Sequence, residues 1–540
     1  MADDTIVDSQ VTQIQGAVSC GSDLCSKAGA RILKAGGNAI DATITTQLCL
    51  GVVNAHASGI GGGGYMLIRK SDGTVACLDF RETAPQAASC KMFMEDESLA
   101  QIGGLAVAVP GEIRGFWEAW QRYGKLPWKQ LFVPAIDLAR NGFEITGHLV
   151  ESMNKVKDTT LAYSSKLRNI YMPGGVPVRE GDVLKRPDLA DTLEIIATEG
   201  VDAFYNGRLS QNIVNAVQQS GGIMTREDLA GYRAIWREPL RMTYLDRTVY
   251  TAPAPSSGPT FMFIMGLLEG YDLKLSEMDD PVIWHRLTET FKHALAHQTQ
   301  LGDLDYVGDV EETTKTMMNK SYLEKVRQGI TDDTTHAPEH YGPASDKSVH
   351  GTANSCVRDS DGNAVVATSS LNWYFGSGVT TDGIVFNEHM EDFCWPTITD
   401  DNQDRKANFI EPGKRPLSGI CPVIAHKTSN NSDTLIIGGI GGKSIVTGVS
   451  QVFLNLTSYG LSLEEAVRRG RLHELSKPRN VLYEERIPKE IIDALEARGH
   501  DMIRRQTSID KIFVIAVEDG KLSAIADQRK KGSGVQYIYA

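Results

Sequence analysis

Two strand-like runs joined by a tight turn constrain the fold of this chain more than any other feature. The first run is Thr352-Ala353-Asn354-Ser355-Cys356-Val357, and the second begins with the apolar stretch from Ala364 to Thr368 and runs into Ser370-Leu371-Asn372. Between them lies Asp361-Gly362, a typical turn pair. Before them the polar segment 330–349, with two prolines and a glycine, predicts an exposed linker. Gly351 and Thr352 therefore stand where a linker meets a strand.

A threonine in this position has a chemical use. A hydroxyl near neutral pH is a poor nucleophile unless a base lies beside it. If the chain is cut before Thr352, the freed α-amine of the same residue can act as that base, because its ordinary pKa is near ~8. A Gly-Thr pair alone does not establish such a cut. Thr352 is therefore a candidate nucleophile that the rest of the chain must support.

The remaining pattern alternates helices with strands. Helices are expected over 22–35, 39–53, 112–123, 128–141, 188–198, 282–301, 444–459 and 463–470. Strands are expected over 65–69, 74–80, 364–375, 383–386, 418–426, 434–439, 511–517 and 522–527. Strand pairs between helical layers predict a layered α/β sandwich with much antiparallel sheet.

Composition and charge exclude some partners. The 540 residues carry a net charge of −13 and contain no Lys/Arg-rich run, which argues against nucleic acid or an anionic membrane surface as the main partner. No run of about 18 apolar residues is present, so no membrane-spanning segment is expected. Residues 1–16 are polar and acidic and do not resemble a signal peptide.

The cysteines and sequons give weaker indications. Eight cysteines are scattered without a CxxC pair, so zinc is not expected, and they are too few for a disulfide scaffold. Three N-x-S/T sequons begin at Asn319, Asn430 and Asn455. Such tripeptides hint at secretion, and they also arise by chance.

A glycine pair between a predicted strand and a predicted helix could bind an anion. Gly441-Gly442-Lys443-Ser444 resembles the end of a phosphate-binding loop, but that motif needs glycine at position 437, which is Ile437. Backbone N–H groups at such a turn can instead hold an oxyanion. A tight turn that needs positive φ is the alternative, and both can hold at once.

One predicted helix carries a row of polar side chains. His285, Glu289, His293 and His297 recur every fourth residue and so share a helix face. This spacing could bind a metal, but no nearby acidic or cysteine motif completes the ligand set. We therefore favour a solvated or packed helix face, and expect no metal.

Three further positions could bind the two charges of an amino acid. Arg81, at the end of a predicted strand, could hold a carboxylate, and Asp392 could pair with an ammonium group. Ser418 could add a polar contact. Alone, each has an ordinary alternative in a surface ion pair, an acidic loop or a strand start. Together with Thr352 and the glycine pair, they describe a site for the amino-acid end of a zwitterionic acyl donor.

Ordered motifs along nearly the whole chain support this interpretation. They are Asn54-Ala55-His56 with Gly59-Ile60-Gly61-Gly62-Gly63, Asp79-Phe80-Arg81-Glu82-Thr83-Ala84-Pro85, Ala108-Val109-Pro110-Gly111-Glu112, Gly221-Gly222-Ile223-Met224-Thr225-Arg226-Glu227-Asp228-Leu229, and Pro412-Gly413-Lys414-Arg415-Pro416-Leu417-Ser418. In these stretches the chain resembles the γ-glutamyltranspeptidase (glutathione hydrolase) family.

The resemblance implies a four-layer αββα sandwich of the N-terminal-nucleophile hydrolase type. It also implies a proenzyme that cuts itself between Gly351 and Thr352. The products would be a large subunit of residues 1–351 and a small subunit of residues 352–540, paired as a heterodimer. No cofactor is implied. The expected location is extracellular or at the cell surface, although the chain shows no export signal, so the cytoplasm stays open.

The family pattern also implies roles for particular residues. Thr352 would attack the γ-glutamyl amide of glutathione or a related compound, and pass the acyl group to water or to an amino acid or dipeptide. The other implied roles are an oxyanion hole at Gly441 and Gly442, a hydrogen bond from Ser370 to the nucleophile, carboxylate binding by Arg81 and Ser418, and ammonium binding by Asp392 and Asn372. Cys25 and Cys49 match a disulfide pair of animal members.

Five positions depart from the family pattern. Asn354 and Cys356 replace a usual His and a usual Ser or Thr, while Ser370 stands where Thr is usual and keeps the hydroxyl. Gly419 replaces a second Ser of the carboxylate pocket. His389 stands where Glu or Gln normally contacts the donor's ammonium, and an imidazole is a poorer partner for that group.

These departures leave alternatives open. We expect an active enzyme with a modified donor pocket. One alternative is a catalytically degenerate paralogue with a scaffolding or interaction role. Another is an acylase for a different amide, such as a β-lactam side chain or a poly-γ-glutamate capsule, although Arg81 and Asp392 favour a donor with a free amino-acid head group.

Overall fold

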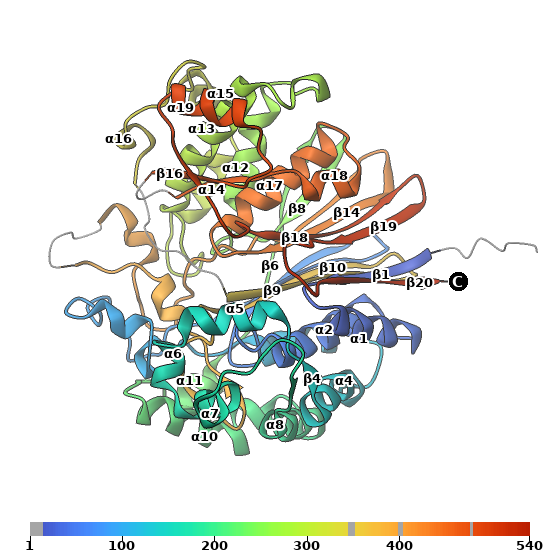
Figure 1. Ribbon diagram of the computed structural model, residues 1–540, viewed down its shortest axis with the longest axis vertical. Helices are drawn as coiled ribbons and strands as arrows, with labels where there is room; N and C mark the ends of the chain where they lie inside the picture. The colour runs from blue at the N-terminus through green and yellow to red at the C-terminus, as the bar shows by residue number, and fades with distance from the viewer. Residues whose placement is uncertain (1–13, 344–350, 398–402, 476–478, 540) are drawn as a thin grey trace, which may run out of the picture.

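Four layers of secondary structure make up the protein. The computed structural model describes residues 14–343, 351–397, 403–475 and 479–539. Two sheets pack face to face, and each has helices on its outer side (Figure 1). The expected αββα sandwich is confirmed.

The first sheet contains the strand that begins with Gly351. In the described part of the chain it has seven antiparallel strands. Their order is β20 (Gly534–Tyr539), β1 (Ile14–Cys20), β9 (Gly351–Arg358), β10 (Ala364–Asn372), β2 (Gly63–Arg69), β3 (Val75–Phe80) and β6 (Ile235–Arg237). The β9–β10 hairpin predicted from the sequence thus lies in the middle of this sheet, between β1 and β2.

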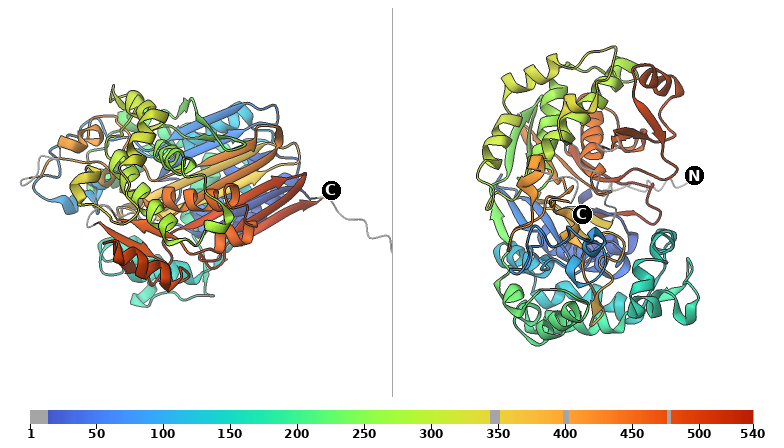
Figure 2. Two further views of the ribbon diagram at one scale, coloured as in Figure 1. Left: turned by 90° about the horizontal axis from the view of Figure 1, so that it is seen from above. Right: turned by 90° about the vertical axis from the view of Figure 1, so that its left-hand side faces the viewer.

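The second sheet lies over the first, as Figure 2 shows from two further directions. Within the described ranges it has six antiparallel strands. Their order is β19 (Lys521–Ala526), β18 (Lys511–Glu518), β14 (Asn430–Ile440), β13 (Val423–Lys427), β8 (Arg247–Thr251) and β7 (Leu240–Tyr244). A smaller sheet of β15 (Leu472–Glu474), β16 (Asn480–Tyr483) and β17 (Asp501–Arg504) stands beside it.

Alternating side chains fill the space between the layers. On β10, Val366 belongs to the core between the two sheets, while its neighbours Val365 and Ala367 pack with the helices outside the first sheet. This period of two is what a strand buried on both faces requires. Phe513 and Ile515 of β18 complete the core from the opposite sheet.

The helices divide between the two outer faces. The first sheet is covered by α1 (Asp23–Lys34), α2 (Ala39–Val53), α3 (Glu112–Tyr123), α4 (Trp128–Asn141), α5 (Gly147–Val156), α7 (Ser165–Tyr171), α8 (Pro187–Glu199) and α10 (Arg208–Gln219). The second is covered by α12 (Gly258–Glu269), α13 (Pro281–Gln298), α14 (Val310–Met317), α15 (Lys320–Gln328), α17 (Ser444–Thr457), α18 (Leu463–Arg468) and α19 (Lys489–Ala497). Every residue of α2 is buried, and a capping box between Asn38 and Asp41 starts it.

Two expectations for single segments need correction. The strand expected from Ser418 starts only at Val423, because the backbone N–H of Ser418 bonds to Pro255 and its hydroxyl accepts from Ile420 N in a local turn. The predicted linker is exposed along most of its described length, but it forms the short helix α16 (Pro338–Tyr341), and Tyr341 is buried. Residues 344–349 lie outside the described part.

Candidate active site

Thr352 and Ser370 face each other at the end of the central hairpin. Thr352 is the second residue of β9, and the antiparallel register sets it opposite Ser370 of β10. Both side chains are buried, at 3% exposure each. They line a pocket of about 330 Å³.

This pocket brings together the residues that the sequence predicts for catalysis and donor binding. They are Arg81, Thr352, Ser370, Asn372, His389, Asp392, Ser418, Gly419, Gly441 and Gly442. They come from the end of β3, from the β9–β10 hairpin, from the short helix η5 (His389–Asp392), from the loop before β13 and from the turn after β14. Their proximity is a finding, and their individual roles stay predictions.

Ser370 is bonded to the peptide bond that is predicted to be cut. Its Oγ lies 2.6 Å from the carbonyl oxygen of Gly351 and accepts a hydrogen bond from the N–H of Asn372 at 2.9 Å. Because the hydroxyl oxygen accepts the hydrogen bond from this backbone N–H, the hydroxyl hydrogen is available to donate to the carbonyl of Gly351. Asn372 has a φ of +78°, and the register of β9 with β10 shifts between Ser370 and Asn372.

Arg81 is paired directly with Asp392. Its Nη2 contacts the carboxylate of Asp392 and donates to the carbonyl of Leu417 at 3.2 Å, and its Nη1 lies 3.4 Å from Glu82. Burial lowers the pKa of Arg81, but Asp392 and Glu82 outweigh burial and leave the pKa raised. The predicted carboxylate ligand and the predicted ammonium ligand are thus neighbours that share one ion pair.

His389 lies between two carboxylates. Its Nδ1 is 2.8 Å from Oε1 of Glu82, and its Nε2 is 4.0 Å from Oδ2 of Asp392. The side chain of Asn387 fixes the start of η5, since its Oδ1 accepts from the N–H of His389 while its Nδ2 donates to Gly61 and Ala108 carbonyls. Although the Nδ1–Oε1 distance is short, the angle is poor for a hydrogen bond, and both atoms are buried without another described partner.

The glycine pair turns the chain from β14 into α17. Gly441 and Gly442 have φ values of +139° and +66°, which side chains rarely adopt. The hydroxyl of Ser444 lies 2.8 Å from the carbonyl of Gly441, so that carbonyl is engaged. The N–H groups of both glycines donate no hydrogen bond to the described backbone. Both readings of the pair, a turn that needs positive φ and a possible oxyanion site, are compatible with this geometry.

Gly419 allows two backbone segments to approach closely. A Cβ built on Gly419 would lie 2.4 Å from the carbonyl oxygen of Gly442, a distance that real Cβ atoms essentially never show. The change from Ser to Gly therefore does more than remove a hydroxyl. It lets the loop before β13 pack against the Gly441-Gly442 turn.

Two of the departures from the family pattern lie away from the pocket. Asn354 donates to Thr368 Oγ1 at 2.8 Å, and the thiol of Cys356 lies 3.4 Å from the Phe513 carbonyl. Both side chains are buried, and neither lines the pocket. Asn354 and Cys356 therefore act on packing and strand pairing more directly than on a substrate.

Sequence reasoning missed part of the pocket wall. The additional lining residues include Gln298, Arg405, Asn408, Lys443, His473, Glu474 and Arg505. It also missed Glu82, which contacts both Arg81 and His389. The sequence signal for Glu82 was its position directly after Arg81. Lys443 belongs to the glycine turn that the sequence marked, whereas no local pattern marks the others, because α13, η6 and β15 border the pocket only through tertiary packing.

The two cysteines expected to pair are buried on neighbouring helices. Cys25 lies on α1 and Cys49 on α2, and both are free thiols in this structure. Burial raises the pKa of both thiols. The disulfide stays a prediction.

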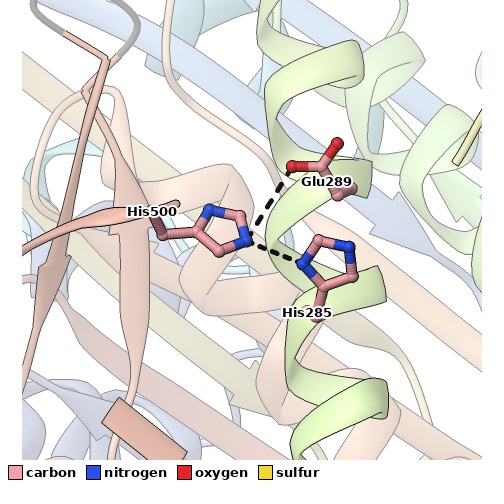
Figure 3. Close-up of side chains that lie close together, drawn as sticks. All are labelled: His285, Glu289 and His500. Atoms are coloured by element: carbon pink, nitrogen blue, oxygen red, sulfur yellow. Dashed lines mark hydrogen bonds and ion pairs between the residues drawn. The ribbon is translucent and has the colours of Figure 1, made fainter. Parts of the chain in front are cut away.

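A second polar cluster lies outside the pocket, on α13. His285, Glu289 and His500 have donor atoms within 4.8 Å of one another (Figure 3). His500, which precedes β17, was missed by sequence reasoning, whereas His297 does not join and contacts Tyr322. The sequence left open whether this helix face is solvated or packed, and the structure shows a packed one: His285, Glu289 and His293 are buried and His297 is half-buried.

Hydrogen bonds already occupy the donor atoms of this cluster. His285 Nε2 lies 2.7 Å from the Thr331 carbonyl and therefore carries hydrogen, so its Nδ1 accepts from His500 Nε2 at 2.8 Å. His500 Nδ1 then accepts from Lys292 Nζ at 3.0 Å, and Lys292 also pairs with Glu289 at 3.2 Å. A metal ion here would have to displace or neutralise the Lys292 ammonium.

The comparisons with known proteins place this chain in a family. The family model for gamma-glutamyltranspeptidase matches residues 25–537. The chain belongs to this family. Glutathione hydrolase proenzyme 1 of Schizosaccharomyces pombe is 38% identical over 97% of this chain and 84% of its own length. Glutathione hydrolase 2 of Arabidopsis thaliana is 37% identical over 97% of this chain and 94% of its own length.

A solved structure shares the architecture of this γ-glutamyltranspeptidase family member. The cephalosporin acylase from Bacillus halodurans superposes with a TM-score of 0.86, is 27% identical, and covers 97% of this chain and 96% of its own. Both belong to the N-terminal-nucleophile hydrolase type of sandwich. Within the described residues, no helix is both long and apolar enough to cross a bilayer.

Proposed function

We propose that this chain is a self-processing γ-glutamyltransferase and glutathione hydrolase. It would cleave the γ-glutamyl amide of glutathione and its conjugates. The observation that carries this proposal is that Thr352 shares one pocket with Arg81 and Asp392, which carry the opposite charges needed for an amino-acid head group. Relatives named glutathione hydrolase over nearly the full chain support the same activity.

The first step would be cleavage of the chain before Thr352. Thr352 Oγ attacks the carbonyl carbon of Gly351, whose oxygen lies 2.6 Å from Ser370 Oγ. A hydrogen bond from Ser370 would stabilise the negative charge that develops on this oxygen. The C–N bond breaks, the Gly351 acyl group moves to Oγ as an ester, and water hydrolyses the ester. The products are a Gly351 carboxylate and a free α-amine on Thr352.

The mature site would then act on the donor. The α-amine of Thr352 takes the proton from its own Oγ, which attacks the γ-carbonyl carbon. The N–H groups of Gly441 and Gly442 would hold the oxyanion, and the leaving amine departs with the proton. Water or the amine of an amino acid or dipeptide attacks the resulting ester and releases Thr352.

The donor's head group would bind at the Arg81–Asp392 pair. Arg81, with Ser418, would hold the α-carboxylate, and Asp392 would hold the α-ammonium. Asn372 Oδ1 is buried without a hydrogen-bond partner among the described residues, so an ammonium N–H would satisfy it. Because Arg81 and Asp392 already neutralise each other, a zwitterion adds no net charge to the buried site.

The two pieces would stay together as a heterodimer after the cut. Residues 1–351 supply β1 and β2, and residues 352–540 supply almost all of β9 and the whole of β10 between them. β13 pairs with β8 across the same division in the second sheet. Both sheets therefore contain strands of both pieces. We further propose an extracellular or cell-surface location, by family resemblance.

Purified protein tests this proposal directly. Denaturing electrophoresis should show bands of about 38 and 21 kDa, with the 59.0 kDa of the chain divided in proportion to residue number. Thr352→Ala should stay as one band and should not release p-nitroaniline from a γ-glutamyl anilide. A wild-type chain that remains whole after prolonged incubation would contradict self-cleavage. Cleaved protein without anilide turnover would favour the degenerate paralogue.

A related acylase activity is the second candidate. The TM-score of 0.86 to the cephalosporin acylase shows how closely the two folds agree. A panel of glutathione, a glutathione conjugate and a glutaryl amide separates the two activities. Cleavage of the glutaryl amide alone would favour the acylase.

A further inference from the structure

One wall of the pocket is formed by the small sheet and carries a cation of its own. Arg505 directly follows β17 and lines the pocket together with Leu482 of β16 and Glu474 of β15. The backbone N–H of Arg505 donates to the carbonyl of Tyr483 at 2.8 Å, which fixes the residue at the end of the small sheet. Arg81 lines the same pocket from the end of β3 in the first sheet. The two arginines therefore reach one pocket from different sheets.

Arg505 has no partner in the part of the chain that the structure describes. Its side chain makes no hydrogen bond and no ion pair there, and its Nε is a buried atom without an acceptor. A guanidinium has five N–H donors and always carries its charge. Buried polar atoms in proteins are almost always hydrogen-bonded, because a buried donor without an acceptor is costly. The missing acceptor is most simply supplied by a ligand in the pocket.

The preceding residue, Arg504, shows the ordinary alternative for an arginine at this place. Arg504 does not line the pocket, and it forms an exposed ion pair with Glu485 at 2.5 Å. Successive residues of an extended chain point to opposite faces. Arg504 is therefore a surface arginine, whereas Arg505 belongs to the pocket.

The cations around Arg505 favour an anion at this wall. Lys443 of the glycine turn also lines the pocket. Lys155 of α5 is a further neighbour, since burial and then the charge of Arg505 lower the pKa of Lys155. An anion between such groups is attracted by all of them.

The carboxylates that line the pocket within the described residues are engaged elsewhere. Asp392 contacts Arg81. Glu474 lies 3.7 Å from the guanidinium of Arg479, which does not line the pocket. Neither carboxylate bonds to Arg505, so the protein itself does not neutralise this arginine.

A peptide carboxylate fits these observations. It can accept two parallel hydrogen bonds from one guanidinium. In the proposed function, the donor's own α-carboxylate is bound at Arg81. The other part of a γ-glutamyl peptide lies beyond the amide that Thr352 attacks, and it ends in a carboxylate. In glutathione this carboxylate is two residues beyond the amide, a reach of roughly 7 Å for an extended chain.

We propose that Arg505 determines the specificity for the leaving and the accepting peptide, by binding its C-terminal carboxylate. This inference rests on the proposed function. It assigns to the enzyme γ-glutamyl peptides with a free C-terminus, in preference to γ-glutamyl amines that lack a carboxylate. The same contact would bind an amino acid or dipeptide acceptor after the first product leaves.

Two donors that differ only in this carboxylate test the proposal. Glutathione and its glycine monoethyl ester have the same γ-glutamyl head group and the same scissile amide. The kcat/KM of each donor is measured with the processed enzyme from the release of glutamate, and the glutathione-to-ester ratio is taken. We expect a ratio of about ten or more for the wild type, as one charge-assisted contact predicts.

Arg505→Met removes the guanidinium and keeps a long apolar side chain. Its ratio should fall to within about threefold of one, because neither donor can then make the contact. Differences in processing or folding affect both donors alike and cancel in the ratio. Arg504→Met is the matched control and should keep the wild-type ratio. An unchanged ratio in Arg505→Met would overturn the proposal.

If Arg505→Met does not process, the wild type alone decides the question. Glycylglycine and glycylglycine amide are compared as acceptors, with γ-glutamyl p-nitroanilide as the donor. The KM of the amide should be about tenfold higher than that of glycylglycine. Equal KM values for the two acceptors, or a glutathione-to-ester ratio near one, would overturn the proposal. A wild-type enzyme that cleaves none of the three donors would instead refute the proposed function, so the two failures are distinguishable.

Discussion

The hydroxyl of Ser370 lies 2.6 Å from the carbonyl oxygen of Gly351, across the two central strands of the first sheet. The hydroxyl also accepts from the N–H of Asn372, which directs its hydrogen to that carbonyl. One residue of β10 thus contacts the bond that precedes the candidate nucleophile. If the chain cuts itself before Thr352 as proposed, this geometry predicts a role for Ser370 in that cut, which can be tested separately from donor turnover.

We expect Ser370→Ala to slow self-cleavage by about tenfold or more, because a hydrogen bond to the developing oxyanion is lost. The measurement is the conversion of one band into two during incubation of freshly purified protein. Ser370→Thr keeps the hydroxyl and should cleave at close to the wild-type rate. Equal rates for the Ala variant and the wild type would show that this hydrogen bond does not contribute.

The close approach of Gly419 to Gly442 leads to a second prediction. Restoring the family's usual serine with Gly419→Ser places a Cβ 2.4 Å from the Gly442 carbonyl oxygen, so the turn must shift. We expect kcat to fall at least tenfold, because a displacement of the proposed oxyanion donors weakens transition-state binding. Gly419→Ser should be compared with Ser418→Ala, which removes a hydroxyl without adding a Cβ. A gain in activity would show that the missing hydroxyl matters more than the contact.

Local patterns predicted much of this fold. The helices 39–53, 112–123 and 128–141 have the expected bounds, because their caps and apolar content are local properties of the chain. The edge strand β20 and its neighbour β1 were missed. β1 and β20 pair with each other although they lie more than 500 residues apart in the sequence. A period-two pattern in the sequence does not show which strands pair.

The site was predicted mainly through motifs that match the family, since its residues come from segments far apart in sequence. Their contacts could not be predicted. No sequence pattern indicates that Arg81 contacts Asp392, or that Glu82 faces His389. Both contacts depend on where η5 lies relative to the end of β3. That position is fixed by tertiary hydrogen bonds, such as those of Asn387 to Gly61 and Ala108.

A buried ion-pair network beside the Gly441 turn provides a stability prediction. Arg471 pairs with Asp510 at 2.6 Å and with Asp527 at 2.7 Å, and all three side chains are buried. Arg471→Met leaves the buried carboxylate of Asp510 without its cation, while Asp527 keeps Arg529, and the unpaired buried charge should cost about 3–5 kcal/mol. Urea denaturation measures the change. Lys489→Met, which breaks an exposed pair with Asp493, is the control and should leave the stability almost unchanged.

Glu112 provides a prediction for stability as a function of pH. Burial raises its pKa to about 8, with a smaller contribution from Glu82, whereas the hydrogen bond from Ser369 lowers it. Since an unfolded glutamate has a pKa near 4.3, the folded state binds more protons than the unfolded state between these two values. The Glu112 contribution is therefore fully present below the unfolded pKa and is lost as the pH rises through the folded pKa, by at most about 1.4 kcal/mol per pH unit. Glu112→Gln removes the titrating group, so its unfolding free energy should depend less on pH than that of the wild type. Denaturation of both proteins at pH 5.5 and 7.5 measures the difference, and parallel changes in the two would show that Glu112 ionises normally when folded.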